Sequence, residues 1–127
     1  MDETDPASIA RAIAEDFVDG FNARDDQRNR DVMNFPSVLL VNGHFKTCDQ
    51  PADYVLPWDR LAESEGWHRS TLDSVEVVQE AADKVHLLVT FSRYDVDDVK
   101  NSPRDGLWVI TRVDGHWGIQ CRTNFIR

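Results

Sequence analysis

Two side chains of this sequence, Asp73 and His68, are the ones that we expect to move a proton. Asp73 stands two and four residues before Val75 and Val77, so in a regular strand it shares their face. A carboxylate on such an apolar face is desolvated and could act as a base. A strand bulge would instead turn Asp73 to the surface, and a bond to backbone or to an arginine would make it structural.

His68 follows Trp67 where a long strand is expected to begin, near the mouth of a pocket. Histidine is the usual proton carrier at physiological pH, and the alternative is a rim histidine without a role. The four histidines show no HxH, HxxxH or HExxH spacing, so we expect no histidine-based metal site. The stretch over residues 95–98 resembles the start of a calcium loop, but the later glycine and glutamate are missing.

Arginines and aromatic rings suggest what the pocket binds. Arg69 and Arg93 could meet an anionic ligand, because an inward arginine needs a partner. Arg93 shares a strand face with Phe91 and Val89, which makes it the better candidate, and its alternative is a salt bridge. Five aromatic residues are expected near the pocket, as ligand contacts or simply as core: Phe17, Phe35, Tyr54, Trp58 and Trp67.

Helices come first among the elements that must position these side chains. Apolar residues at every fourth position predict a helix over about residues 6–23, with Asp5 as its cap. Gly20 near its end could let another group approach the backbone. A second helix is expected over about residues 26–34, and a third from Pro51 to about Gly66, kinked at Pro57.

Strands fill the rest of the chain. Asn42-Gly43 and Asp114-Gly115 stand between apolar runs, which is the pattern of a two-residue hairpin turn. Early helices and late strands predict a single α+β domain over residues 1–127, with helices packed on an antiparallel sheet. The strands are expected over residues 37–41, 44–46, 67–80, 84–94, 105–113 and 116–126.

Strict alternation along the strands predicts which side chains face the helices. It puts Ile119 toward the helices and Arg122 on the opposite face. It also puts Trp108 and Ile110, with Leu88, on the outer face of the sheet. A face in water does not need these residues, so we expect a second copy to cover them and the protein to be a homodimer.

Composition and charge narrow the partners and the compartment. A net charge of -9 opposes binding to phosphate backbones, so we expect no nucleic acid and no anionic membrane as a partner. No segment approaches the length of a membrane helix, and the acidic start does not resemble a signal peptide. Cys48 and Cys121 form no CxxC motif, so we expect reduced thiols in a cytoplasm, with Cys121 buried and inert.

Several stretches resemble recurrent segments of nuclear-transport-factor-2-like (NTF2-like) proteins, and more closely of their SnoaL-like group. The resemblance covers nearly the whole chain. It implies a cone-shaped, cystatin-like α+β barrel, in which a strongly bent antiparallel sheet wraps around a helix, commonly in a homodimer. The segments are Phe17-Val18-Asp19-Gly20-Phe21-Asn22-Ala23-Arg24-Asp25, Asn34-Phe35-Pro36, Gly66-Trp67-His68 and residues 111–122.

The resemblance implies a range of activities and selects none of them. The superfamily includes ketosteroid isomerase, scytalone dehydratase, polyketide cyclases, epoxide hydrolases, dioxygenase small subunits and proteins with no known chemistry. Its enzymes mostly need no cofactor, so we expect none here. Our first hypothesis is a cone that binds a small, mostly apolar organic molecule, with or without acid–base chemistry. The alternatives are a non-catalytic binding or sensing module, and an interaction protein whose cone is filled by its own side chains.

Overall fold

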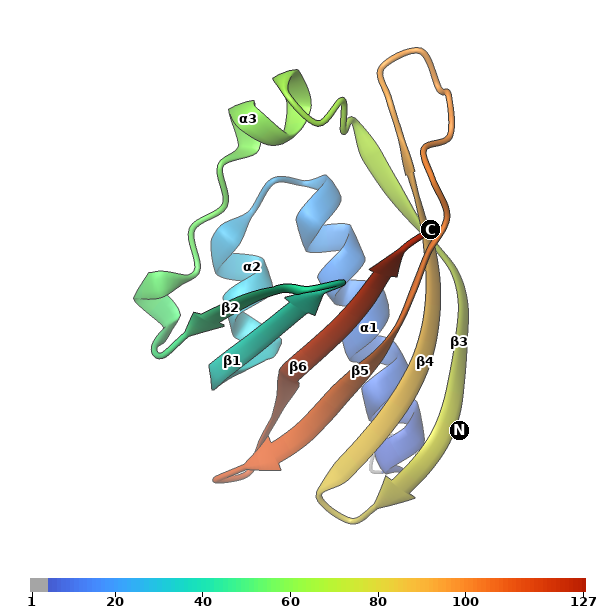
Figure 1. Ribbon diagram of the computed structural model, residues 1–127. Coiled ribbons are helices and arrows are strands. Elements are labelled where there is room, and N and C mark those ends of the chain that lie inside the picture. The colour runs from blue at the N-terminus through green and yellow to red at the C-terminus, as the bar shows by residue number, and fades with distance from the viewer. Residues whose placement is uncertain (1–4) are drawn as a thin grey trace.

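The computed structural model describes residues 5–127 (Figure 1). The acidic stretch over residues 1–4, on which the expectation about a signal peptide rests, lies outside the described residues. None of the helices within residues 5–127 is long and apolar enough to cross a membrane. In chain order the elements are α1 (Pro6–Asn22), α2 (Asp26–Asp31), β1 (Met33–Val41), β2 (His44–Cys48), the 3-10 turn η1 (Pro51–Asp53), α3 (Trp58–Glu63), β3 (Arg69–Ala81), β4 (Lys84–Tyr94), β5 (Arg104–Val113) and β6 (His116–Ile126).

The strands form one six-stranded sheet in the order β2-β1-β6-β5-β4-β3. The four-strand meander from β3 to β6 is antiparallel, as the sequence predicts. The β1–β2 hairpin joins it through a parallel pairing of β1 with β6, which the sequence pattern does not reveal. The long strands β3 and β4 curve, so that the sheet bends around α1 (Figure 1).

Helix α1 lies across the concave face of the sheet, and its predicted start and cap are confirmed (Figure 1). The Asp5 carboxylate accepts hydrogen bonds from the backbone N–H of Ser8 at 3.3 Å and from its hydroxyl at 2.8 Å. These bonds satisfy groups that the first helical turn leaves unpaired. The apolar stripe of α1 then packs on the sheet, with Phe17 edge-on to Trp108 at a ring-centroid distance of 5.7 Å.

The turn between α1 and α2 depends on a close approach at Gly20. Asn29 of α2 is fully buried, and a Cβ placed on Gly20 would lie 2.1 Å from Asn29 Oδ1. The other end of the amide, Asn29 Nδ2, donates to the hydroxyl of Tyr54 at 3.0 Å. Because Gly20 has no side chain, α2 can lie close enough to α1 for Asn29 to hold the Tyr54 hydroxyl in place.

The predicted third helix is wrong as a continuous element. Residues 51–53 form the turn η1, Tyr54 is extended, and α3 begins only after Pro57. Proline lacks a donor N–H and forces the preceding residue into an extended conformation, so it divides the segment and does not merely kink it. The second helix is also shorter than predicted, because β1 already begins at Met33.

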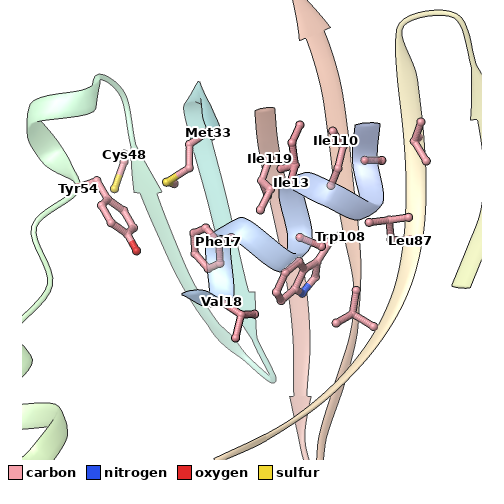
Figure 2. Packing of buried hydrophobic residues seen from close by; sticks show 14 residues of the cluster. Ile13, Phe17, Val18, Met33, Cys48, Tyr54, Leu87, Trp108, Ile110 and Ile119 are labelled. Atoms are coloured by element: carbon pink, nitrogen blue, oxygen red, sulfur yellow. The ribbon is translucent and has the colours of Figure 1, made fainter. Parts of the chain in front are cut away.

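The predicted facing of two strands is wrong, that of β5 along its whole length and that of β6 beyond a bulge. Trp108 pairs with Arg122 and Ile110 pairs with Ile119, so Gln120 is an extra residue between two stretches of the ladder. One extra residue reverses which side chains point inward beyond it. In β5, Trp108 and Ile110 are instead paired with inward-facing residues of β4, so they are buried in the core and not on the outer face (Figure 2). Beyond the bulge, Arg122 faces the helix side together with Trp108, opposite to the prediction.

Candidate functional site

A cavity of 280 Å³ lies where α1 and β6 end, between the concave face of the sheet and α3. Its size is close to the lower end of ordinary ligand sites. It also exceeds the roughly 100 Å³ below which we would regard the cone as filled by its own side chains. Most of its wall is aromatic or aliphatic, with Phe17 and Phe21 from α1, Phe91 from β4 and Trp108 from β5.

The charged side chains of this wall are almost all positive. The chain carries a net charge of -9, and yet a single carboxylate lines the cavity within residues 5–127. Like charges gathered in one cleft produce a local field opposite to that of the whole protein. The charged residues of the wall are Lys46, Arg60, Arg93, Arg104 and Arg122, with Glu65 as the acid.

Arg122 is the cation most closely enclosed by aromatic rings. Its Cζ lies 4.5 Å from the ring centroid of Phe17 and 5.7 Å from that of Trp108. Within residues 5–127, no side-chain hydrogen bond or ion pair of its guanidinium is present. Burial lowers the pKa of Arg122, but an arginine remains charged in a protein. Arg122 is therefore a charge whose only compensation in the described chain is the faces of two rings.

Arg93 and Arg104 lie beside the one acid of the wall. Arg93 Nη1 is 3.3 Å from Glu65 Oε1, and 47% of the Glu65 side chain is exposed, which places this pair toward solvent. Burial lowers the pKa of Arg93, and the charge of Glu65 opposes that effect. Burial also lowers the pKa of Arg104, and the charge of Arg93 adds to the effect. The single carboxylate of Glu65 thus compensates the charges of two guanidinium groups only in part.

A second, smaller cavity of 40 Å³ adjoins this site on the β1–β2 side. Tyr54 lines it and is 4% exposed, while Lys46 and Arg122 line both cavities. Burial raises the pKa of the Tyr54 phenol, and the charge of Arg122 opposes this shift. In Figure 2, Tyr54 lies near Cys48 of β2 and Met33 of β1, apart from the cluster around Ile110.

Solved structures share this architecture at low sequence identity. An NTF2-like protein with a cystatin-like fold from Novosphingobium aromaticivorans matches with a TM-score of 0.74 and 14% identity, over 92% of this chain and 79% of that chain. The chain has the NTF2-like, cystatin-like fold. An NTF2-like protein of unknown function from Shewanella oneidensis matches with a TM-score of 0.74 and 10% identity, over 95% and 99% of the two chains.

A further match is a putative calcium/calmodulin dependent protein kinase II association domain from Xanthomonas campestris. It has a TM-score of 0.68 and 14% identity, over 97% of this chain and 89% of that chain. No family model matches the sequence, and no curated protein matches it. At such identities the matches establish the NTF2-like fold and no activity. Membership of the SnoaL-like group therefore stays a prediction.

The NTF2-like cone brings only some of the predicted ligand contacts to its cavities. Phe17 and Arg93 line the main cavity, and Tyr54 lines the small one. Trp58 and Trp67 form a layer behind the wall, each with its ring centroid 4.9 Å from that of Phe21. Phe35 packs against the core and lines neither cavity. Arg93 also forms the salt bridge that was its alternative role.

Asp73 does not reach the cavity, and its predicted inward facing is wrong. It is the extra residue of a bulge in β3, where the ladder shifts between Leu72 and Ser74. Its carboxylate accepts hydrogen bonds from Thr71 Oγ1 at 2.8 Å and from the hydroxyl of Ser92. Asp73 is exposed and satisfied by these neighbours, as in the alternative in which a bulge turns it outward.

His68 and Arg69 also lie away from the cavity. His68 is exposed, and its backbone N–H donates to the carbonyl of Tyr94 at 2.8 Å. The Arg69 guanidinium lies over the ring of Tyr94 and pairs with Asp98 at 2.6 Å. These contacts anchor the edge of the NTF2-like sheet, and they do not bring the predicted proton carriers together.

Sequence reasoning missed four cations of the site: Lys46, Arg60, Arg104 and Arg122. The one signal available for Arg122 was its position in a strand beside Trp108, once a bulge before it is assumed. Lys46 belongs to a hairpin whose place beside β6 follows only from the parallel β1–β6 pairing. Arg104 lies at the boundary of β5, where the alternating pattern has just begun.

Proposed function

We propose that this protein binds a small organic anion in its cone, with an apolar body against the aromatic wall and an anionic group on Arg122. The observation that carries the proposal is Arg122, a cation among aromatic rings with no acidic partner in residues 5–127. An enclosed charge is costly unless it is paired, and the anion of a ligand would provide the pair. A neutral apolar ligand would leave this cost in place.

The shape of the wall supports the same ligand class. Phe91 and Trp108 have ring centroids 6.0 Å apart on adjacent strands, and Phe17 faces Trp108 from α1. Such rings present flat apolar surfaces to a ligand body. A guanidinium binds a carboxylate through two parallel hydrogen bonds, which also sets the orientation of the ligand.

The proposed function is binding of the anion without a chemical reaction. Among residues 5–127, Glu65 is the carboxylate that lines the cavity, and Arg93 already holds it. A general base must lie within reach of the proton that it removes. Asp73 and His68 are both exposed and line neither cavity, which gives no support to the catalytic roles predicted for them.

Isothermal titration calorimetry with naphthoate and with its neutral amide, naphthamide, tests the proposal. We expect naphthoate to bind and naphthamide to bind about tenfold or more weakly, since the amide cannot neutralise Arg122. Arg122→Met should weaken naphthoate by about ten- to a hundredfold. Arg69→Met is the control, because that guanidinium pairs with Asp98 away from the cavity. Equal binding of the two compounds, or an unchanged Arg122→Met, would refute the proposal.

We also propose that two copies pair through the outer face of the sheet, in a cytoplasm. Leu88 and Phe125 are 45% and 49% exposed there, which supports pairing although Trp108 and Ile110 belong to the core. Both cysteines are free, which supports a reducing compartment. Light scattering at micromolar concentration should give the mass of a dimer, and the mass of a monomer would remove the pairing.

A further inference from the structure

The small cavity is an annex of the main one and not a separate site. Four residues line both cavities: Leu39, Lys46, Leu56 and Arg122. Its 40 Å³ exceeds what a single water needs, and it suits a group of a few atoms. We call it the annex. A ligand in the main cavity therefore has Arg122 and Lys46 beside it, and a further small chamber next to those two cations.

The annex offers donors and cations and no acid. Lys46 and Arg122 contribute charges, and Tyr54 contributes a hydroxyl. The Tyr54 oxygen accepts from Asn29 Nδ2 at 3.0 Å, and no acceptor for its own O–H is present within residues 5–127. Burial raises the pKa of Tyr54, so the phenol keeps its proton and remains a donor. A neutral donor beside two cations is complementary to an oxyanion.

The other cations of the wall are a poorer match for an anionic group. Arg93 is paired with Glu65 at 3.3 Å, so its charge is already partly compensated. Arg104 Nη1 donates to the carbonyl oxygen of Ser102 at 3.0 Å. An anion beside these two residues would also meet the charge of Glu65, whereas no acid among residues 5–127 lines the annex. The charge of Asp26 does reach Tyr54, where it adds to the effect of burial in raising the pKa.

We propose that the annex is the head-group subsite: the anionic group of the ligand binds among Tyr54, Lys46 and Arg122, and the apolar body extends through the main cavity toward Glu65. This inference rests on the proposed function and adds the orientation of the ligand to it. The ligand class is an apolar molecule that ends in one compact oxyanion. The small volume favours a flat carboxylate over a tetrahedral sulfonate.

The test compares variants of the annex with variants of the opposite end. Calorimetry with naphthoate should show that Tyr54→Phe weakens binding about tenfold, because it removes a buried donor to the carboxylate. Lys46→Met removes an exposed cation and should weaken binding by up to about fivefold. Arg93→Met and Arg104→Met, at the Glu65 end, should change it by less than about threefold. Naphthalene sulfonate in place of naphthoate should bind more weakly and be less sensitive to Tyr54→Phe.

A steric variant tests the annex without removing a donor. Cys48 lines the annex, so Cys48→Leu should fill it and weaken naphthoate about tenfold. Cys121→Leu is the matched control, because Cys121 pairs with Val109 on the outer side of the sheet and lines neither cavity. Circular dichroism of each variant checks that the fold is retained.

The outcomes separate this inference from the proposed function. If naphthoate binding needs Arg122 but is insensitive to the three annex variants, the head-group subsite is wrong and anion binding stands. The same holds if Arg93→Met or Arg104→Met causes the largest loss. If naphthoate does not bind at all, both proposals fail.

Discussion

The two ends of the cone differ sharply although α1, β5 and β6 run through both. At one end Ile13, Ile110 and Ile119 pack between the helix and the sheet, and the last two are fully buried (Figure 2). At the other end the same elements present Trp108 and Arg122 to a cavity of 280 Å³. The boundary is the bulge between these two stretches of β6. We call the closely packed end around Ile110 the filled end. The end that contains the cavity, with Arg122 and other polar groups in its wall, is the hollow end.

The polar groups of the hollow end do not all stabilise the fold. Asn124 Oδ1 accepts a hydrogen bond from Trp108 Nε1 at 2.9 Å, which satisfies a buried donor. Arg122 has no comparable partner within residues 5–127. Departures from consistent packing and pairing are expected at functional sites. The hydrogen-bonded Asn124 therefore stabilises the fold, whereas the unpaired Arg122 is the residue expected to belong to the binding site.

The largest effect should come from the filled end. Ile110→Ala should lower the free energy of unfolding by about 2–5 kcal/mol, because the methyl groups it removes lie in a closed core. Leu39→Ala, at the wall of both cavities, should cost less because its neighbours are less closely packed. Urea unfolding followed by circular dichroism measures both, and equal losses would break the distinction between the ends.

The next effect tests the hydrogen bond at the boundary of the hollow end. Asn124→Ala should cost about 1–2 kcal/mol, since it leaves the Trp108 N–H without its acceptor. The same urea experiment applies. Thr123→Ala is the control, because Thr123 pairs with Leu107 on the outer side, and it should change stability by less than about 0.5 kcal/mol. Similar values for the two variants would mean that Asn124 contributes nothing specific.

Arg122→Met should stabilise the fold, whereas Ile110→Ala should destabilise it. Replacing an enclosed, unpaired charge by an apolar side chain of similar length should raise the free energy of unfolding by about 1 kcal/mol. The midpoint of urea unfolding should rise with an unchanged slope. A loss of stability above about 1 kcal/mol would show that Arg122 belongs to the packing of the fold, and the contrast between the ends would be lost.

The smallest effect is a pH dependence that Tyr54 gives to the hollow end. Burial raises the pKa of Tyr54 above its ordinary value of about 10, so the folded chain keeps a proton that the unfolded chain releases. This contribution is complete below about pH 10 and is lost as the pH rises through the folded-state pKa. Tyr54→Phe should unfold with a shallower loss of stability above about pH 10. Parallel curves for the two proteins would contradict the shift.

Local patterns were sufficient for most of the fold. Asp114 and Gly115 have φ values of 51° and 81°, as the predicted hairpin turn requires, and the strands on both sides follow. The predicted third helix failed because Pro57 outweighs the apolar spacing around Tyr54 and Trp58. Turns and helix breaks depend on neighbours in the sequence, which explains why most helices and strands could be predicted from local patterns.

The site depended on features that no local pattern contains. Alternation along β6 allows two inward faces, one that contains Ile119 and Cys121 and one that contains Arg122 and Ile126. Each of the two faces includes an apolar residue, so hydrophobicity does not choose between them. The alternation therefore does not show that the choice changes at Gln120. In β3 the bulge at Asp73 has the same effect, so the two most informative polar positions were assigned to the wrong faces.

The bulge at Gln120 gives the last strand an evolutionary property as well. Deleting that one residue would restore a regular ladder and keep Arg122 opposite Trp108, so Arg122 and Asn124 would still face the cone. Closing the bulge in a strand of unchanged length would instead turn Cys121 and Thr123 toward the cone in their place. Relatives with and without the extra residue should therefore accept ligands of the same charge, whereas a single insertion or deletion that no bulge absorbs should change that charge.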